Sequence, residues 1–316
     1  MKKFAFVFPG QGSQSVGMMD AWGEHPAVLE TLKEASDALG EDVTRLIKEG
    51  PKEALALTTN TQPVMLVAGV AAWRVWRAEG GPLPSVVAGH SLGEYSALVA
   101  SGVLTLAQAA PLVRFRAAAM QEAVPVGTGA MAAILGLDAA KVITGCAEAQ
   151  TTFGVSSAEV VEAVNFNDPA QTVIAGSKAA VDKACEVLKA YGAKRALLLP
   201  VSAPFHSSLM KPAAEKLKEK LAATPMATPQ IPVVNNIDVS VVTDIEAIRD
   251  ALYRQAFGPV RWVECVRAIK EQGVSTLVEC GPGKVLAGLI KRIDAELSGV
   301  PLYDPATLAE VRTLLA

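Results

Sequence analysis

Residues 85–100 constrain the fold of this chain more than any other stretch, because a short apolar run passes at once into a helical pattern. Residues 86–88 indicate a buried strand, and apolar residues recur at helical spacing from 92 to 99. Between them lies Gly89-His90-Ser91-Leu92-Gly93, a match to G-x-S-x-G. In a strand–turn–helix this pattern exposes the serine hydroxyl at the tip of a sharp turn, where it can act as a nucleophile. An ordinary tight turn with a capping serine fits the same five residues, so the pattern alone leaves both interpretations open.

The residues around Ser91 suit a nucleophile. A Cβ on either glycine of the pattern would collide with the neighbouring strand or helix. The N–H of Leu92 falls at the N-terminus of the expected helix, where it can stabilise an oxyanion.

The composition indicates a globular protein. The 316 residues suffice for one large domain, or a large and a small one. Hydrophobic residues make up 51% and charged residues 19%, which excludes a disordered chain, and a net charge of −3 gives no case for nucleic-acid binding. The four cysteines form no C-x-x-C, which argues against a zinc site or a disulfide framework and fits a reducing compartment.

The N-terminus imitates the start of a signal peptide, because Lys2-Lys3 precedes an apolar run. That run stops at Pro9-Gly10, which is too short for a signal peptide. No stretch approaches the ~18 apolar residues of a membrane span. We therefore expect a soluble cytoplasmic protein without membrane attachment.

Strand and helix patterns predict an α/β protein. A strand at 4–8 ends in the glycine- and amide-rich loop 9–14, and helices are predicted at 26–39, 42–49, 61–79 and 105–123. We expect Pro111 to kink or split the last of these helices. Towards the C-terminus, helices are predicted near 207–222, 244–256 and 260–272, followed by a strand at 275–280.

Residues 130–200 are expected to form a separate unit. Strands are predicted at 131–137, 160–165, 171–175 and 194–199, with helices at 138–148 and 177–191. This β-α-β-β-α-β order is the ferredoxin-like motif. Asn165-Phe166-Asn167-Asp168-Pro169 is a turn signal that joins its two halves. We expect a small domain at 128–200, inserted into a large α/β domain formed by 1–127 and 201–316.

A serine needs a base, and the chain has three histidines. His25 precedes a proline between helical segments, where we expect it to be exposed. His90 adjoins Ser91 and should point to the other side of the chain. His206 lies at an element end and remains the workable base, although a single histidine is also often structural. No carboxylate flanks it, so an orienting group must come from elsewhere.

Further motifs occur in the order of one enzyme family and cover nearly the whole chain. They are residues 8–14, residues 89–95, Arg116 with Met120-Gln121, residues 165–167, residues 171–176, residues 204–207, Gln255 with residues 259–262, and residues 279–283. Through them the chain resembles the malonyl-CoA:acyl-carrier-protein transacylases of bacterial fatty-acid synthesis and the related acyltransferase domains of polyketide synthases. The resemblance implies a hydrolase-like large domain with a parallel sheet and a nucleophile elbow, and an inserted ferredoxin-like small domain.

The resemblance also implies roles for single residues. Ser91 would carry the malonyl group as an ester, with His206 as general acid and base. The backbone N–H groups of Gln11 and Leu92 would form the oxyanion hole. Arg116 would pair with the malonyl carboxylate through two parallel N–H donors, which a lysine cannot offer.

Three more residues complete the expected substrate site. Gln255 would lie near the serine and histidine, where the family uses a backbone carbonyl to orient the histidine. His90 and Phe205 would border the substrate. Phe205 would exclude an α-methyl group, because polyketide relatives with a smaller residue there tend to take methylmalonyl.

The implied reaction is ping-pong transfer of malonyl from malonyl-CoA to the pantetheine thiol of holo-acyl carrier protein. It implies no bound cofactor and no metal, and we expect a monomer. The carrier would dock on basic side chains, for which the candidates are Lys178, Lys183, Lys189, Lys194 and Arg195, or Lys284, Lys291 and Arg292.

Three alternatives stay open. A trans-acting polyketide-synthase acyltransferase would use the same chemistry with another carrier. A thioesterase of the α/β-hydrolase type would also want an Asp or Glu between serine and histidine, and would have no use for Arg116. A non-catalytic carrier-binding protein would not need Ser91 and His206. Three features depart from the family pattern, namely Pro111, a longer loop at 150–158 and Gly258.

Overall fold

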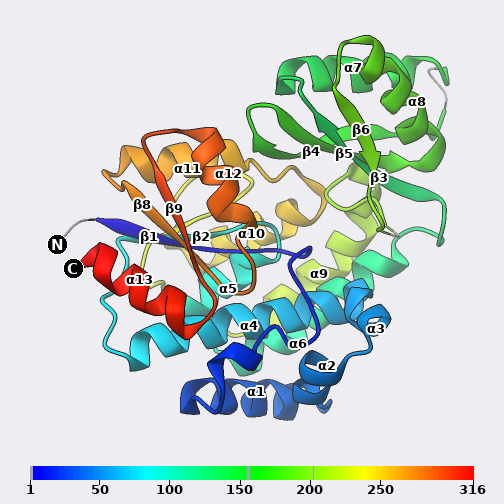
Figure 1. Ribbon diagram of the computed structural model, residues 1–316. Helices are drawn as coiled ribbons and strands as arrows, with labels where there is room; N and C mark the ends of the chain where they lie inside the picture. The colour runs from blue at the N-terminus through cyan, green and yellow to red at the C-terminus, as the bar shows by residue number, and fades with distance from the viewer. Residues whose placement is uncertain (1–2, 155–156, 202) are drawn as a thin grey trace.

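The structure is a computed structural model that describes residues 3–154, 157–201 and 203–316 (Figure 1). Within these residues the lower body contains a parallel sheet in the order β7-β2-β1-β8-β9. Its strands are β1 (Phe4–Phe8), β2 (Val86–Gly89), β7 (Val233–Val234), β8 (Thr276–Cys280) and β9 (Ser298–Leu302). Because all five run in one direction, their carboxyl ends lie along the same edge, which is where open α/β sheets bind ligands.

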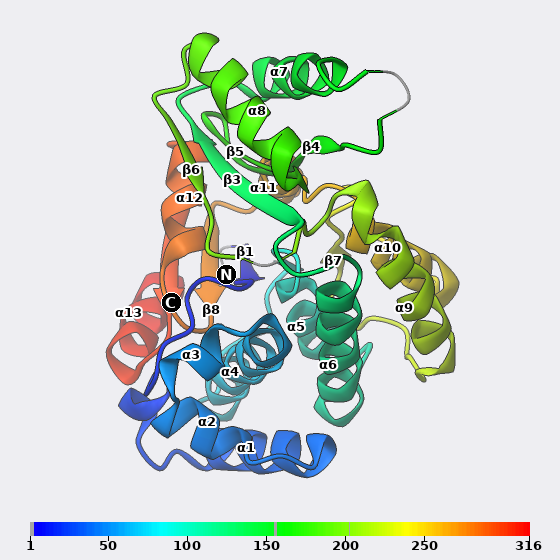
Figure 2. The same ribbon diagram turned by 90° about the vertical axis from the view of Figure 1, so that its right-hand side faces the viewer.

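Helices surround this sheet. They are α1 (Pro26–Leu39), α2 (Val43–Glu49), α3 (Lys52–Ala56), α4 (Thr58–Ala78), α5 (Gly93–Ala100), α6 (Leu106–Glu122), α9 (Lys211–Ala223), α10 (Ile245–Phe257), α11 (Trp262–Glu271), α12 (Val285–Ile293) and α13 (Pro305–Leu315), with the short 3₁₀ turns η1 (Asp20–Trp22) and η2 (Ser208–Met210). In Figures 1 and 2, α4 and α5 lie on one face of the sheet, and α11 and α12 on the other.

The alternation of side chains along β1 explains this layering. Phe4, Phe6 and Phe8 belong to the core on the α4 side, where Phe6 meets Trp73 edge to face with ring centroids 5.5 Å apart. The intervening Ala5 and Val7 belong to the core on the α11–α12 side. Since both faces of a parallel sheet are covered, the strand is apolar throughout rather than alternating with polar residues.

A second, antiparallel sheet lies above the first in Figure 1. In the described part of the chain its order is β4-β5-β3-β6, formed by β3 (Gly129–Leu135), β4 (Val161–Asp168), β5 (Gln171–Ser177) and β6 (Arg195–Leu198). The helices α7 (Ala139–Thr151) and α8 (Lys178–Ala190) pack with it in one core cluster. The strands and helices expected over 130–200 are thus present in the expected order.

Backbone contacts tie β4 to the lower body. The N–H of Phe166 donates to the carbonyl of Val260 at 3.0 Å, and the N–H of Val260 donates to the carbonyl of Val164 at 2.8 Å. Arg292 of α12 also pairs with Asp168 at 2.7 Å. The edge of the parallel sheet at which its strands end therefore faces a second sheet that is held in place.

Several local predictions were wrong. Pro111 does not split α6, which runs unbroken from 106 to 122 and starts in a Thr105–Gln108 capping box. Its buried face outweighs the lost hydrogen bond, which costs ~3 kcal/mol in a helix interior. Residues 165–168 do not turn but continue β4, because they pair with β5 and Val260.

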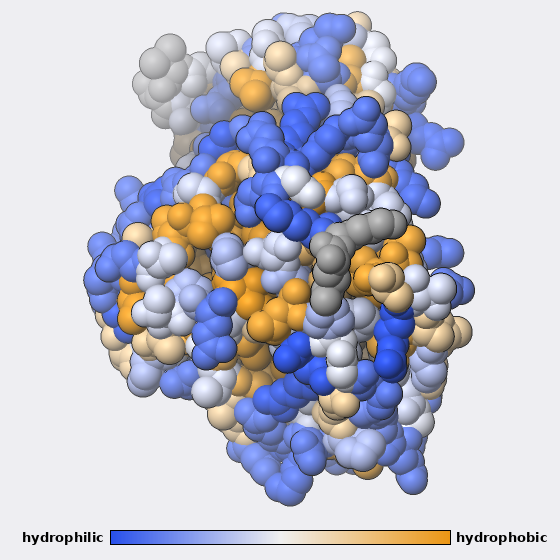
Figure 3. Space-filling model, turned by 90° about the vertical axis from the view of Figure 1, so that its left-hand side faces the viewer, coloured by the Kyte–Doolittle hydropathy of each residue, from blue (hydrophilic) through white to orange (hydrophobic). Residues whose placement is uncertain are grey.

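Other boundaries and segments also differ from expectation. α4 starts at Thr58 rather than at Thr61, so Pro63 lies inside the helix. In the longer loop expected at 150–158, Val155 and Ser156 lie outside the described residues, as does Lys2 at the N-terminus. No helix among the described residues is long and apolar enough to cross a membrane. The face that carries the chain termini is mostly polar, with apolar side chains interspersed near its middle (Figure 3).

Candidate active site

Ser91 lies on a sharp turn between β2 and α5. Its φ of +53° is in the left-handed region, which few residues other than glycine adopt. A Cβ on Gly89 would lie 1.9 Å from the backbone of Gly93, and a Cβ on Gly93 would lie 2.0 Å from the carbonyl oxygen of Phe8. Among the described residues, no side-chain hydrogen bond caps α5. The turn is therefore the strained one that the pattern predicts for a nucleophile, not a serine-capped turn.

The hydroxyl of Ser91 points at His206. The distance from Ser91 Oγ to His206 Nε2 is 2.7 Å, and His206 Nδ1 lies 2.8 Å from the backbone carbonyl of Gln255. A carbonyl only accepts, so Nδ1 carries the proton and Nε2 presents its lone pair to the serine. This is the tautomer that a general base needs, and a backbone carbonyl of α10 selects it.

Burial keeps His206 neutral. Its side chain is 4% exposed, and burial, with a smaller contribution from the positive charge of Arg116, lowers its pKa to about 3. An imidazole with this pKa has its acceptor nitrogen free at neutral pH. His206, like Ser91, has a positive φ, at +66°. Both members of the pair therefore occupy strained backbone positions, as is frequent at functional sites.

A buried guanidinium stands beside the serine. Arg116 of α6 is 1% exposed and donates from Nη2 to Ser91 Oγ at 3.2 Å and to Gln255 Oε1 at 3.1 Å. Its Nη1 donates to Gln62 Oε1 at 2.6 Å, and its guanidinium carbon lies 5.5 Å from the ring centroid of Tyr95. In the described chain no carboxylate lies at ion-pair distance from it. Burial lowers the pKa of Arg116, so an incoming carboxylate would stabilise its charge.

Arg114 shows the contrast. Two positions away on the same helix, it donates to the carbonyl of Thr59 and to Asn60 Oδ1, both at 2.7 Å, and pairs with Glu41. It therefore ties α6 to the start of α4 and has its carboxylate partner already.

Ser91 and Arg116 lie over a small cavity of about 120 Å³. Its lining combines polar residues at one end with apolar ones, and consists of Gln11, Gln62, His90, Ser91, Leu92, Arg116, Met120, Met131, Asn165, Leu199, Val201, Phe205 and His206. The backbone N–H groups of Gln11 and Leu92 have no acceptor among the described residues. They are therefore available to a ligand oxygen in this cavity.

The structure brings the predicted site residues together, with one difference of position. Gln255 does not line the cavity but lies fully buried behind it. Its carbonyl contacts His206, its Oε1 accepts from Arg116, and its Nε2 donates to the backbone carbonyl of Ser91 at 3.0 Å. Gln255 thus connects the serine, the histidine and the arginine.

The other two histidines do not take the position of the base, although His90 lines the cavity. His90 Nε2 lies 2.8 Å from Asn167 Oδ1 of β4, and its ring packs edge to face on Trp262. It points away from the serine, as expected. His25, expected to be exposed, is half-buried, because its Nδ1 accepts from the N–H of Ala27 and begins α1.

Sequence reasoning missed four polar residues around the site. Gln62 holds Arg116, Asn167 holds His90, and Glu94 and Asn236 hold the turn of Ser91. Glu94 is 2% exposed, and burial raises its pKa to about 7. A glutamate that falls on the apolar face of the helix after the motif is a signal that could have identified it.

Comparisons with known proteins agree with these observations. Residues 5–303 match the acyl transferase domain family. The chain is 54% identical over 310 residues to the malonyl CoA-acyl carrier protein transacylase of Escherichia coli K12, covering 98% of each chain, and 45% identical to that of Bacillus subtilis, covering 98% and 96%.

Solved structures agree as well. An acyl-carrier-protein S-malonyltransferase from Burkholderia pseudomallei has a TM-score of 0.95 and 63% identity, covering 98% of this chain and 99% of that one. A malonyl-transacylase in complex with a type II polyketide synthase acyl carrier protein has a TM-score of 0.94 and 52% identity, covering 98% of both chains.

Proposed function

The chain belongs to the acyl transferase family and transfers malonyl groups from malonyl-CoA to acyl carrier protein in fatty-acid synthesis, and we propose that it does so through an ester on Ser91 with His206 as general acid and base. One observation carries this mechanism. Ser91 Oγ lies between a neutral base, 2.7 Å away at His206 Nε2, and a buried cation, 3.2 Å away at Arg116 Nη2. A base activates the hydroxyl, and a cation without a carboxylate partner suits an acyl group that carries one.

The first half-reaction acylates the enzyme. His206 Nε2 takes the proton of Ser91 as the oxygen attacks the thioester carbonyl of malonyl-CoA. The backbone N–H groups of Gln11 and Leu92 bind the resulting oxyanion, and each such donor lowers the barrier by ~3 kcal/mol. The intermediate collapses, the carbon–sulfur bond breaks, and the proton on His206 goes to the departing CoA thiol.

The second half-reaction reverses these roles. His206 takes the proton of the pantetheine thiol of holo-acyl carrier protein, and the sulfur attacks the malonyl ester. The ester bond breaks, and the proton on His206 returns to Ser91. Because a thioester is exchanged for a thioester, the scheme uses its two substrates and no cofactor.

Arg116 selects the acyl group in this proposal. Its two Nη groups bind the free carboxylate of malonyl, replacing in part the contacts to Ser91 Oγ and Gln255 Oε1. Gln62 and Gln255 hold the guanidinium through neutral amide oxygens, and no carboxylate among the described residues lies at ion-pair distance from it. Phe205, which is 7% exposed in the cavity, limits the room at the α-carbon of the acyl group.

We also propose the finer domain description. The parallel sheet with its elbow after β2 supports a hydrolase-like large domain at 1–127 and 201–316. The order β4-β5-β3-β6 with α7 and α8 on the sheet supports a ferredoxin-like small domain at 128–200. Cys146, Cys185, Cys265 and Cys280 are all free, which supports a reducing compartment such as the cytoplasm.

Two alternative functions differ from this proposal in testable ways. A hydrolase of the Ser-His-Asp type orients its histidine with a carboxylate. Here the backbone carbonyl of Gln255 takes that place, which favours transfer. A polyketide acyltransferase would have the same site, and one structural relative is bound to a polyketide carrier. Carrier choice therefore separates these two routes.

The test is a transfer assay with malonyl-CoA and holo-acyl carrier protein from a fatty-acid or a polyketide system. We expect malonyl to appear on the fatty-acid carrier with little free malonate, and loss of transfer in Ser91→Ala and His206→Ala. Release of CoA with free malonate as the main product would instead indicate a thioesterase. Transfer to the polyketide carrier alone would indicate the other acyltransferase.

A further inference from the structure

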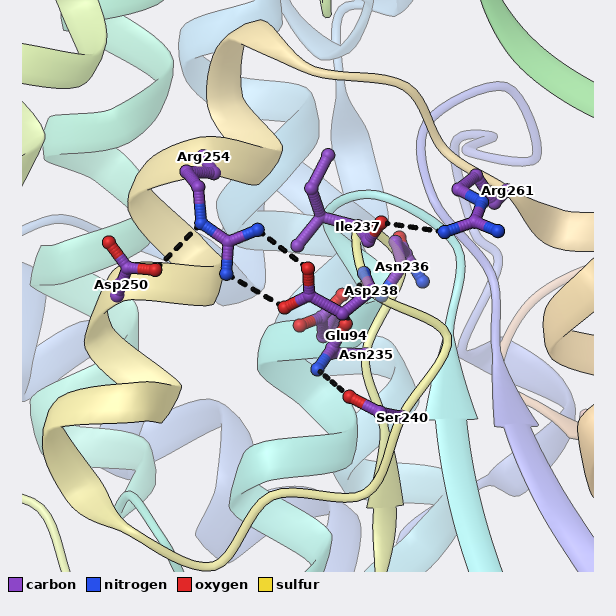
Figure 4. Close-up of polar contacts among 9 residues, drawn as sticks. All are labelled: Glu94, Asn235, Asn236, Ile237, Asp238, Ser240, Asp250, Arg254 and Arg261. Carbon is purple, nitrogen blue, oxygen red and sulfur yellow. Dashed lines mark hydrogen bonds and ion pairs between the residues drawn. The ribbon is translucent and has the colours of Figure 1, made fainter.

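The turn that follows β7 reaches the back of the Ser91 turn. β7 pairs with β2, so the carboxyl ends of both strands lie side by side at the active-site edge. Asn236 comes two residues after the end of β7, is fully buried, and points at the turn between β2 and α5. Asn236 thereby contacts the backbone of Ser91, and Figure 4 shows it among the polar residues of the segment 235–240, beside Glu94.

The side chain of Asn236 brackets Ser91. Its Oδ1 accepts from the N–H of Ser91 at 2.7 Å, and its Nδ2 donates to the carbonyl of Gly89 at 2.7 Å. One amide thus satisfies a donor and an acceptor of the backbone on the two sides of His90. The sharp turn gives these groups no partner of their own, and a buried unpaired group costs ~1–3 kcal/mol.

The backbone of Asn236 connects the turn to the base. Its N–H donates to Glu94 Oε2 at 2.9 Å, and Glu94 Oε2 also accepts from Gln255 Nε2 at 2.9 Å. Gln255 in turn holds His206 through its carbonyl. A continuous path of hydrogen bonds therefore runs from the backbone of Ser91 to the imidazole, without contacting any reacting atom until His206.

An ion pair at the surface fixes the turn from outside. Arg254 of α10 donates to both carboxylate oxygens of Asp238 at 2.6 and 2.7 Å, and to Asp250 at 2.7 Å (Figure 4). Such forked pairs fix geometry as well as adding energy. The turn needs this support, because Val239 has a φ of +57°, a rare conformation for a β-branched residue.

Gly258, a departure from the family pattern, belongs to the same arrangement. A Cβ there would lie 2.5 Å from Ile237 Cδ1 and 2.8 Å from the carbonyl oxygen of Arg254. The end of α10 can therefore approach the turn closely only with glycine at this position. Arg261 adds a second tie, since its backbone N–H and its Nη1 each donate at 3.3 Å, to the carbonyls of Asn236 and Ile237.

We propose that Asn236 is a positioning residue for acylation, which holds the Ser91 turn so that its hydroxyl and the N–H of Leu92 face the thioester, and that the Arg254–Asp238 pair acts on the reaction through Asn236. The inference rests on the proposed acylation of Ser91. According to this inference, the Arg254–Asp238 pair at the surface affects the rate at which the buried Ser91 is acylated.

The experiment follows single-turnover acylation by intact-protein mass over a range of malonyl-CoA concentrations, which separates the limiting rate from half-saturation. The variants are Asn236→Ala, Asn236→Asp and Arg254→Ala. Arg249→Ala is the matched control, because Arg249 also lies on α10 and pairs with Glu246 but donates to carbonyls of Leu221 and Thr224 instead of the turn. Thermal unfolding of each variant shows whether it is folded.

We expect Asn236→Ala to lower the limiting rate ~100-fold, the size of effect that small misplacements cause, with half-saturation unchanged within about twofold. Arg254→Ala should lower it several-fold and Arg249→Ala should leave it unchanged. Arg254→Ala should add little to Asn236→Ala, because the two act through one path.

The pH dependence of Asn236→Asp distinguishes a positioning role of Asn236 from a merely structural one. A protonated carboxyl accepts and donates as the amide does, whereas a carboxylate cannot donate to Gly89. Glu94 faces position 236 from α5 and Cys265 from α11, with Asp238, Arg254 and Arg261 around the turn. The neighbouring Glu94 favours protonation of a second acid. The limiting rate of this variant, divided by that of the wild type, should therefore rise as the pH falls from 8 to 6.

A folded Asn236→Ala variant with the wild-type limiting rate would overturn the proposal, as would an Asn236→Asp variant whose pH profile runs parallel to that of the wild type. If the Asn236 variants do not fold, equal rates for Arg254→Ala and Arg249→Ala would overturn it. A wild-type protein that malonyl-CoA does not acylate would instead contradict the proposed function, so the two failures are distinguishable.

Discussion

Arg116 donates to the hydroxyl oxygen of Ser91 across 3.2 Å, and its other polar contacts are to amide oxygens of Gln62 and Gln255 rather than to a carboxylate. A cation buried in this way next to a nucleophile is costly unless a charged ligand completes it. In the proposed function this relationship sets which acyl groups the site accepts, and it leads to the first prediction.

Arg116→Ala should lower kcat/KM for malonyl-CoA. The expected loss corresponds to about 2–5 kcal/mol of transition-state stabilisation, as for truncation of one member of a buried charge pair. Acetyl transfer should be spared or improved, because acetyl has no carboxylate. Parallel assays with the two CoA thioesters measure the difference, with Arg114→Ala as control because Arg114 already pairs with Glu41. An equal loss for both acyl groups would contradict the assignment.

The limiting acylation rate should not show the fall at acid pH that protonation of an ordinary histidine would cause. The pKa of His206 is lowered from 6.5 to about 3, so the base remains deprotonated as the pH falls from 8 to 5, and the limiting acylation rate should not fall with a midpoint near 6.5. Glu94, whose pKa is raised to about 7, titrates in this window, so the measurement is made also in Glu94→Gln. A midpoint near 6.5 that persists in Glu94→Gln would show that His206 titrates normally.

The same shift affects stability with a definite sign. The unfolded chain takes up a proton on this imidazole below pH 6.5, whereas the folded protein does so only near pH 3. His206 therefore lowers the free energy of unfolding as the pH falls from 6.5 towards 3. In urea titrations His206→Gln should lose less stability over this range than the wild type does.

Phe205 should set the size limit at the α-carbon. Phe205→Ala should raise the ratio of methylmalonyl to malonyl transfer ~10-fold or more, since one methyl group in a tight pocket is worth ~1–3 kcal/mol. Leu199→Ala is the control, because Leu199 lines the same cavity six positions before Phe205 in the chain. Competition between the two CoA thioesters gives the ratio directly. No change in Phe205→Ala, or the same change in both variants, would count against a specific role for Phe205.

Carrier docking should depend on basic side chains that have no carboxylate partner. Of the candidates, Lys178, Lys183 and Arg292 pair with Asp182, Glu186 and Asp168. The other candidates make no ion pair among the described residues, namely Lys189, Lys194, Arg195, Lys284 and Lys291. Lys284 lies at the start of α12 and Lys291 in its last turn. Lys284→Glu should therefore raise the KM for holo-acyl carrier protein more than Lys178→Glu does.

Salt provides the check on this docking prediction. Screening weakens contacts between exposed charges, so the KM for carrier should rise with ionic strength in the wild type and less steeply in Lys284→Glu. A KM that does not depend on salt would exclude electrostatic docking.

The candidate pair Ser91 and His206 could be predicted from the sequence because local patterns identify both residues. Gly89 and Gly93 fix a turn with no room for a Cβ, and with three histidines in the chain, elimination left His206 as the partner of Ser91. Arg116 was another matter. Its position in the helical pattern does not distinguish it from a solvent-exposed arginine such as Arg114 was expected to be. Only the family resemblance identified it as a site residue.

The roles of the polar residues around this pair could not be predicted. These residues and their partners become neighbours only through the order of the strands in the sheet. Asn236 follows a strand of two residues, Val233–Val234, which is too short to show a period of two. Its role depends on β7 lying next to β2, although 145 positions of sequence separate Asn236 from Ser91. Leu286, Leu289, Ile290 and Ile293 do carry a readable helical pattern, so α12 was within reach of the sequence.

The most direct test of the Ser91 ester is the intact mass of the protein after brief mixing with malonyl-CoA, in the absence of carrier, for the wild type and for Ser91→Ala. We predict a mass gain of one malonyl group on the wild type and none on Ser91→Ala, with CoA released in step with the gain. A malonyl mass that also appears on Ser91→Ala, or CoA release with no acylated protein, would contradict the ester on Ser91.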